Sequence, residues 1–266
     1  MTTETCSISQ ATLLMNEIKK TGGKVFTNYF SNFPEDDEAD LLTTDGAIVF
    51  IKKDWKMSRV FFCSNNPGKL AELLATCPEG SAIDYIVKGD NDLSDVFHTG
   101  GFAHYSTYTK KGMHFDDINE LHLNSRIYER CYNENCAITA TEADIPQLLD
   151  LMEAVFDAKT DHFPSEGEWR HIINNNRVYL YKDGGTIKSF NAFEVKGKRY
   201  YFHINYSSAT PDVLYSLDKK ALLDAKRDHK INYAFAWFDT KNKNAIKRLN
   251  LNDEGIYDYI FIKTIC

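Results

Sequence analysis

Hydrophobic positions in the second half of the chain alternate between helical spacing and short apolar runs. Thr141 and Asp144 form a capping-box pattern, and the helix that they predict runs to about Asp157. Its apolar residues recur every three or four positions: Ile145, Leu148, Leu149, Met152 and Phe156. A β-prone run at 136–140 precedes this helix, and a second, shorter helix is predicted after Ser165, so the half begins strand, helix, helix.

Three β-rich runs follow, at 177–183, 186–197 and 198–208. The turn residues Gly184, Gly185 and Gly197 separate them, which predicts an antiparallel meander. Thr210 and Pro211 are suited to open the next helix. A strand at 231–239, a helix from about 242 and a final strand at 256–263 complete the pattern.

The first half shows a shortened version of the same order. Helical patterns occupy 8–21, 66–77 and the region after 93, and β-prone runs occupy 47–53, 58–64 and 82–89. A further strand is predicted at 104–113. No residue-level repeat links the halves, so the duplication is inferred from element order alone.

The order of elements in the second half resembles that of the GNAT superfamily of N-acyltransferases, in which an Asn opens the last helix. Asn242 and Ala245 match the family's N-x-x-A pattern. The resemblance implies an α+β fold with two GNAT-like domains, each a mostly antiparallel mixed sheet flanked by helices. The expected division is a truncated domain at 1–113, a linker at 114–135 and a clearer domain at 136–266.

The resemblance also implies a reaction and its ligands. A GNAT enzyme moves an acyl group from a thioester donor, here acetyl-CoA, another acyl-CoA or an acyl carrier protein, to a small-molecule or peptide amine. Its fourth and fifth strands splay apart and expose backbone groups to the donor's pantetheine arm, and the corresponding runs here are 198–208 and 231–239. The residues expected to bind the donor are Ile204, Asn205, Tyr206, Ser207, Ser208 and Asn242.

Strict alternation places Arg199, Tyr201, His203, Asn205 and Ser207 on one face of their strand, an unusually polar face for a central strand. His203 is the leading candidate for the general base, because imidazole titrates near neutrality. A hydrogen-bonded core histidine explains it equally well.

Three other positions carry two readings each. Glu194 is the alternative base, or a solvated strand end. Asn242 either contacts the donor or only caps its helix. Ala234 and Ala236 either admit a thin ligand to the backbone or pack tightly against a helix.

Two departures from the family's pattern bear on the chemistry. The glycine-rich pyrophosphate loop should fall at 206–213, where the chain reads YSSATPDV without glycine. The family's general-acid tyrosine aligns with Leu249, so Tyr257 or Tyr259 would have to donate the proton. These departures keep open a second reading, a catalytically inactive GNAT-fold module that binds a ligand or a protein.

Charge is unevenly distributed along the chain. The formal net charge is −7, yet residues 182–266 hold 15 basic and 10 acidic side chains, a balance of +5. An acidic acyl carrier protein would meet such a surface. The basic side chains expected to contact it are Lys219, Lys220, Lys226, Arg227, Lys247 and Arg248.

Composition excludes several other classes. The six cysteines form no C-x-x-C pair, and no zinc-site spacing follows Cys131 and Cys136, so no metal is expected. The acidic chain has no basic-aromatic module, which argues against nucleic acid. No apolar window is long enough for a membrane span, and the start of the sequence lacks a signal-peptide pattern, so a cytoplasmic location is expected.

Overall fold

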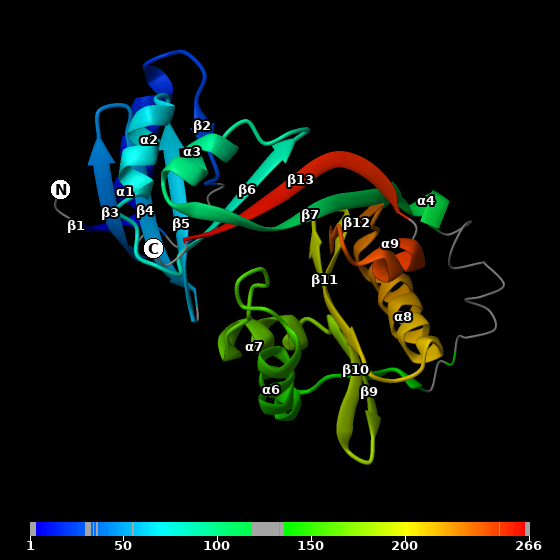
Figure 1. Ribbon diagram of the computed structural model, residues 1–266. Helices are drawn as coiled ribbons and strands as arrows, with labels where there is room; N and C mark the ends of the chain where they lie inside the picture. The colour runs from blue at the N-terminus through cyan, green and yellow to red at the C-terminus, as the bar shows by residue number, and fades with distance from the viewer. Residues whose placement is uncertain are drawn as a thin grey trace. The chain divides into compact units, whose positions relative to one another are not determined.

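The computed structural model describes residues 4–29, 33, 35, 37–54, 56–118, 133, 136–249 and 251–263. The chain forms two compact units (Figure 1). Unit 1 contains Met1–Tyr108, Asp157–Phe163 and Ile256–Cys266, and unit 2 contains Thr109–Phe156 and Pro164–Gly255. The boundaries fall inside two long strands, β7 (Phe102–His114) and β13 (Asn252–Lys263), so each of these strands supplies residues to both units.

The boundaries of the two units differ from the domain boundaries that the sequence predicts. The sequence assigns everything from 136 onward to one domain, whereas the residues from Ile256 on cluster with unit 1. The expected linker lies mostly outside the described residues, which show a short helix, α4 (Phe115–Ile118), at its start.

Unit 1 has the strand order β1-β3-β4-β5-β6-β13, continued by β7. The short strand β2 pairs with the C-terminal end of β5. Every pairing with a described register is antiparallel except that between β5 and β6. The strands are β1 (Glu4–Ser7), β2 (Phe26–Thr27), β3 (Glu38–Thr44), β4 (Ala47–Asp54), β5 (Met57–Ser64) and β6 (Ala82–Lys88). The helices are α1 (Ile8–Lys20), α2 (Pro67–Leu74) and α3 (Ser94–Thr99).

Both faces of this sheet are covered, which explains the continuous apolar run AIVFI in β4. Ile48 and Phe50 belong to a cluster that includes residues of α1. Val49 and Ile51 point the other way, into a cluster with the leucines of α2 and with Phe97 of α3. Alternate side chains of one strand therefore serve two separate cores.

Unit 2 has the order β7-β12-β11-β10-β9-β8. The antiparallel meander predicted from the sequence is present, and β11 pairs in parallel with β12. The strands are β8 (Ile138–Thr139), β9 (Val178–Asp183), β10 (Thr186–Lys196), β11 (Arg199–Ser207) and β12 (Tyr233–Asp239). The helices are α6 (Ile145–Val155, preceded by the 3-10 turn Glu142–Asp144), α7 (Glu166–Asn174), α8 (Pro211–His229) and α9 (Lys243–Leu249).

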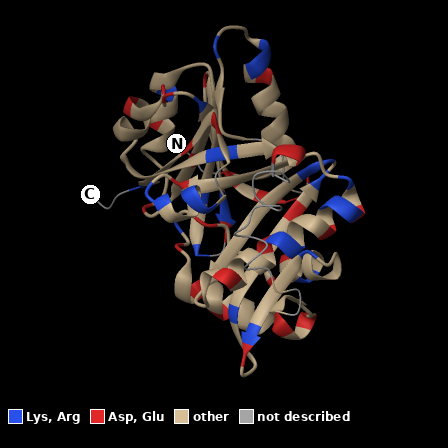
Figure 2. Cartoon of the chain, turned by 90° about the vertical axis from the view of Figure 1, so that its right-hand side faces the viewer, with Lys and Arg blue, Asp and Glu red and all other residues tan. Residues whose placement is uncertain are grey.

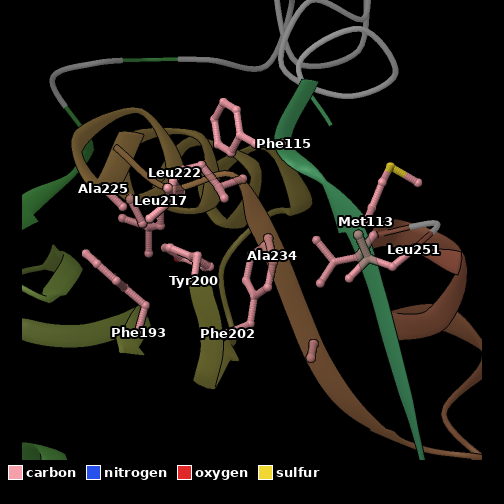
Figure 3. Close-up of a cluster of buried hydrophobic side chains, with 14 of the residues drawn as sticks. Met113, Phe115, Phe193, Tyr200, Phe202, Leu217, Leu222, Ala225, Ala234 and Leu251 are labelled. Atoms are coloured by element: carbon pink, nitrogen blue, oxygen red, sulfur yellow. The ribbon is translucent and has the colours of Figure 1, made fainter. Parts of the chain in front are cut away.

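Helices pack on both faces of this sheet as well. The buried stripe of α8, which includes Leu217 and Leu222, contacts Tyr200 and Phe202 of β11 (Figure 3). On the opposite face the fully buried Trp169 of α7 lies edge-on to Phe190 of β10, with ring centroids 6.0 Å apart.

A cluster of charged groups in unit 1 surrounds Arg59, whose side chain is only 8% exposed. Its guanidinium donates to the backbone carbonyls of Ala158 and Lys159, each at 3.0 Å, and pairs with Asp84 at 3.3 Å. Arg59 thereby ties the segment Asp157–Phe163 to the sheet of unit 1.

Asp84 and Asp258 place two carboxyl groups next to each other beside this arginine. Asp84 lies opposite Ile260, so Asp258 is its diagonal neighbour on the same face of β6 and β13. Burial raises the pKa of Asp258 well above its usual value, and the charge of Asp84 adds to the shift. The Oδ1 atom of Asp258 is buried and has no hydrogen-bond partner among the described residues.

We expect the Asp258→Asn variant to be more stable than the wild type at neutral and alkaline pH. The folded-state pKa of Asp258 lies above the unfolded value of about 3.9, so its ionisation costs stability as pH rises through the folded-state pKa. Thermal melts from pH 5 to pH 9 should show a gain of about 2 to 4 °C at the alkaline end. The gain should shrink toward pH 5, and a gain independent of pH would contradict the assignment.

Candidate functional site

The parallel strands β11 and β12 separate partway along their length. Their paired residues run from Arg199 and Tyr233 to Phe202 and Ala236, where the pairing ends among the described residues. Beyond this point lie the strand ends His203–Ser207 and Trp237–Asp239, here called the β11–β12 split. On its other edge β11 remains paired with β10 as far as Ser207, so only the edge toward β12 opens.

A β-bulge lies where the split begins. Phe202 is opposite Phe193 of β10, but Ile204 is opposite Ala192, so His203 is an extra residue in the ladder. A bulge bends its strand and re-aims the side chains that follow. The bulge therefore turns β11 at the position where it leaves β12.

The bulge also corrects the expected alternation along β11. Asn205 was predicted to share a face with Tyr201 and His203, but its Nδ2 donates to Asp218 of α8 at 3.1 Å. Tyr206 points to the other side, where its ring lies 6.0 Å from that of Phe190. The prediction was wrong because one inserted residue reverses a period of two.

His203 lies beside an aromatic row at the start of the split. Its ring is 5.3 Å from that of Tyr201, in an edge-to-face arrangement. Tyr201 in turn stacks on Phe235 of β12, with centroids 4.9 Å apart and planes within 10°. The half-buried imidazole is thus held next to the last paired residues.

Glu194 lies on the same face, because it is the direct cross-strand partner of Tyr201. Its side chain is 28% exposed, and the ammonium of Lys196 is 3.9 Å away. The structure therefore brings the two predicted bases, Glu194 and His203, to neighbouring positions around one tyrosine.

Tyr257 belongs to unit 1, whereas Glu194, Tyr201 and His203 belong to unit 2. It lies in the part of β13 that belongs to unit 1, opposite Val87 of β6, and its ring is 6.1 Å from that of Tyr259. Its role as proton donor stays a prediction.

The turn from β11 into α8 uses its own hydrogen-bonding groups locally. Both the amide and the hydroxyl of Ser208 donate to the carbonyl of Lys188, at 2.8 and 3.1 Å. The hydroxyl of Ser207 accepts from the amide of Ala209 at 3.2 Å. Asp212 then places a carboxylate in the first turn of α8, where it opposes the binding of an anion.

Asn242 caps α9. Its Oδ1 accepts a hydrogen bond from the amide of Ala245 at 3.1 Å, which accounts for the N-x-x-A pattern in local terms. A contact between Asn242 and a donor stays a prediction.

The two alanines of β12 pack into the core. Ala234 and Ala236 are buried and lie opposite Tyr200 and Phe202, in the cluster covered by α8 (Figure 3). They precede the split, so tight packing accounts for their small side chains, and Trp237–Asp239 form the β12 side of the split.

A buried polar network that sequence reasoning missed lies over the split. Asp218 of α8 is fully buried and pairs with Arg248 of α9. Its Oδ1 also accepts from the Nδ2 groups of Asn191 and Asn205, at 2.7 and 3.1 Å. Burial raises the pKa of Asp218, and the charge of Arg248 opposes that shift. The available signal was an aspartate on the apolar stripe of α8, at a position four residues before Leu222.

The basic side chains expected to meet an acyl carrier protein are largely engaged within the chain. Lys220 and Arg227 both pair with Asp224, at 3.0 and 2.8 Å, and Lys226 lies 3.9 Å from Asp116. Figure 2 shows basic and acidic positions interspersed on the helices. The net positive charge of the C-terminal third is therefore not gathered into one unpaired basic patch on α8.

No group of His, Cys, Asp or Glu side chains in the described part of the chain has metal-binding geometry. No helix in the same residues is both long and apolar enough to cross a membrane.

No protein-family model matches the sequence, and no curated protein matches it. Several solved structures are similar to this chain in fold. A GCN5-related N-acetyltransferase from Sphaerobacter thermophilus has a TM-score of 0.57 at 9% identity, covering 88% of this chain and 84% of its own. A GNAT-family acetyltransferase from Colwellia psychrerythraea has a TM-score of 0.54 at 8% identity and covers both chains completely.

A tandem GNAT protein from the clavulanic acid biosynthesis pathway, solved without AcCoA, has a TM-score of 0.56 at 8% identity and covers 98% of both chains. At such low identity these likenesses show the fold alone. They confirm the GNAT fold and the α+β class with mixed sheets predicted from the sequence.

The buried network yields a stability prediction. Arg248→Met should lower the free energy of unfolding by about 3 to 5 kcal/mol, because it leaves the carboxylate of Asp218 buried without its counter-charge. The double variant Asp218→Asn with Arg248→Met should recover most of that loss, since an amide oxygen still accepts from Asn191 and Asn205. Urea unfolding measures both values, and equal losses in the single and double variants would contradict the prediction.

Proposed function

We propose that unit 2 is an N-acyltransferase that moves an acyl group from a pantetheine-type thioester to a primary amine. The observation that carries the proposal is the β11–β12 split with a bulge at its start. The open edge of β11 offers backbone N–H and C=O groups to an extended, amide-bearing arm, as an edge strand does to a peptide. The GNAT fold supports acyl transfer as the reaction class.

The residues present fit the arm of such a donor better than a diphosphate. The edge of β11 from His203 to Ser207 is free of β12, and its length of five residues suits a linear chain with two amides. At the start of α8, Ser208 already donates to Lys188, and Asp212 adds negative charge. Donor binding in this proposal therefore rests on the arm and the acyl group.

His203 acts as the general base in the proposed reaction. It accepts a proton from the acceptor ammonium, directly or through water, and the neutral amine attacks the thioester carbonyl. The C–N bond forms, the nitrogen releases its extra proton to solvent, the C–S bond breaks, and the departing thiolate takes up a proton from solvent. Backbone N–H groups at the bulge stabilise the carbonyl oxygen as it gains charge. Glu194, which neighbours the same tyrosine, is the alternative acceptor of the proton.

The donor is either an acyl-CoA, acetyl-CoA included, or an acyl carrier protein, and the acceptor is a small-molecule or peptide amine. The pairing of Lys220 and Arg227 with Asp224 favours the CoA thioester over the acidic protein.

A second candidate function is a binding module without chemistry. The observations that favour it are the missing glycine loop, the carboxylate of Asp212 at the helix start, and Leu249 at the position of the family's tyrosine. In that case the split binds a ligand and no amide product forms.

We expect acetyl-CoA to raise the melting temperature of the protein saturably. Acetyl-pantetheine should raise it by a similar amount at the same concentration, because the proposed binding rests on the arm and the acyl group rather than on the phosphates. Longer acyl-CoAs and an acyl carrier protein are tested in parallel to identify the donor. If none of these compounds shifts the melting temperature, the transferase proposal fails and the module that binds another ligand is favoured.

His203→Ala should lower kcat by about 100-fold or more, because it removes the general base, while the melting temperature changes by only a few degrees. The matched control is His171→Ala, which removes an exposed histidine of α7 and should keep full activity. Steady-state kinetics with the donor identified above measures both variants. Unchanged turnover in His203→Ala would remove His203 from the catalytic role.

A further inference from the structure

Unit 1 contains a second parallel strand pair that separates. The described register of β5 and β6 consists of Arg59 opposite Ala82, although β5 continues to Ser64 and β6 to Lys88. The strand portions beyond that pair are here called the β5–β6 split. Farther along, β2 pairs with β5 at Cys63 and Ser64, so on this edge of β5 the backbone groups between Arg59 and Cys63 lie outside both described ladders.

The side chain of Asn28 fills the β5–β6 split. Its Nδ2 donates to the carbonyl of Val60 in β5 at 2.9 Å and to the carbonyl of Asp84 in β6 at 3.0 Å. Its Oδ1 accepts from the amide of Phe62 at 2.8 Å. Asn28 is only 7% exposed, so a buried carboxamide replaces the missing ladder bonds between the two strands.

The segment that carries Asn28 is attached to β5 and approached through glycines. Phe26 and Thr27 form β2, and the hydroxyl of Thr27 donates to the carbonyl of Phe62 at 2.7 Å. Gly22 and Gly23 precede it with φ values of 81° and 89°, a region that favours glycine. This turn of the chain places the side chain of Asn28 between β5 and β6.

The three hydrogen bonds define what the split recognises. Two carbonyl oxygens on different strands require two N–H donors from one nitrogen, and the amide of Phe62 requires an acceptor on the same group. A primary carboxamide provides this set in a plane, whereas a secondary amide has one N–H and a ketone has none.

We propose that the β5–β6 split is a binding site for a primary carboxamide, and that its resident ligand is the side chain of Asn28. In unit 1 the carboxamide of Asn28 therefore occupies the β5–β6 split, whereas in this proposal no side chain of the protein has that role in the β11–β12 split. While Asn28 is in place, this site takes up no external ligand. The inference rests on contacts within unit 1 and is independent of the proposed transferase activity.

The test is chemical rescue of Asn28→Gly, which deletes from the protein a group equivalent to acetamide. The variant should melt about 5 to 10 °C below the wild type, because three buried backbone groups lose their partner. Acetamide should then raise its melting temperature saturably by about 2 to 4 °C, and should not raise that of the wild type. N-methylacetamide should act more weakly, and acetone should not act.

Two further measurements keep the test decisive. Thr27→Val is the matched control, since it removes two neighbouring hydrogen bonds, to the carbonyl of Phe62 and from the amide of Tyr29, but leaves Asn28 in the split, and it should show no rescue. If Asn28→Gly does not fold, Asn28→Ala provides a smaller deletion, which is titrated with formamide, the carboxamide of matching size. Equal effects of acetamide and acetone, no rescue in either variant, or equal rescue in Thr27→Val would overturn the proposal. None of these outcomes depends on whether an acyl donor binds to unit 2.

Discussion

Every backbone N–H and C=O group on a strand inside a protein needs a hydrogen-bond partner, and two parallel strands that diverge deprive each other of theirs. This constraint governs both units. In unit 1 the chain meets it internally, because Asn28 bonds to β5 and β6 at once. In unit 2 the pairing described for β11 and β12 ends at Phe202 and Ala236, and the edge of β11 beyond Phe202 has no parallel neighbour in that register. The difference between the two splits is the reason to place the chemistry in unit 2.

The β11–β12 split is fixed from two sides. Below it, the side chains of Tyr201 and Phe235 stack across the last paired residues. Above it, Asp218 and Arg248 join α8, which follows β11, to α9, which follows β12. Burying this ion pair costs desolvation energy that is offset only when the carboxylate is fully hydrogen-bonded, and the amides of two asparagines complete its set. A costly buried network is well suited to hold two helices in position while the strands beneath them part.

The sequence predicted the order of elements well and the side-chain directions on β11 poorly. Helices and strands followed from apolar spacing, glycine turns and caps, which are local signals. The strand Glu38–Thr44 was missed, because its apolar positions follow an acidic run that reads as a loop. The faces of β11 were misassigned beyond His203, since a bulge depends on how two strands pair and no local pattern specifies it. Asn28 was missed for the same reason: its partners at Val60 and Asp84 are 32 and 56 residues away.

The proposed mode of binding the acyl donor depends on which hydrogen-bonding groups of the protein are already paired within the chain. At the start of α8, Ser208 is committed to the carbonyl of Lys188, and Asp212 repels a phosphate group. At the split, the edge of β11 has lost its parallel neighbour. Recognition by such an edge depends on the spacing of amides along an extended chain, so in the proposed transferase the affinity for the acyl donor would come from the part nearest the reacting carbonyl. In the proposed reaction, binding close to the reacting atoms would also limit their motion relative to His203, which is the condition for efficient proton transfer from the amine.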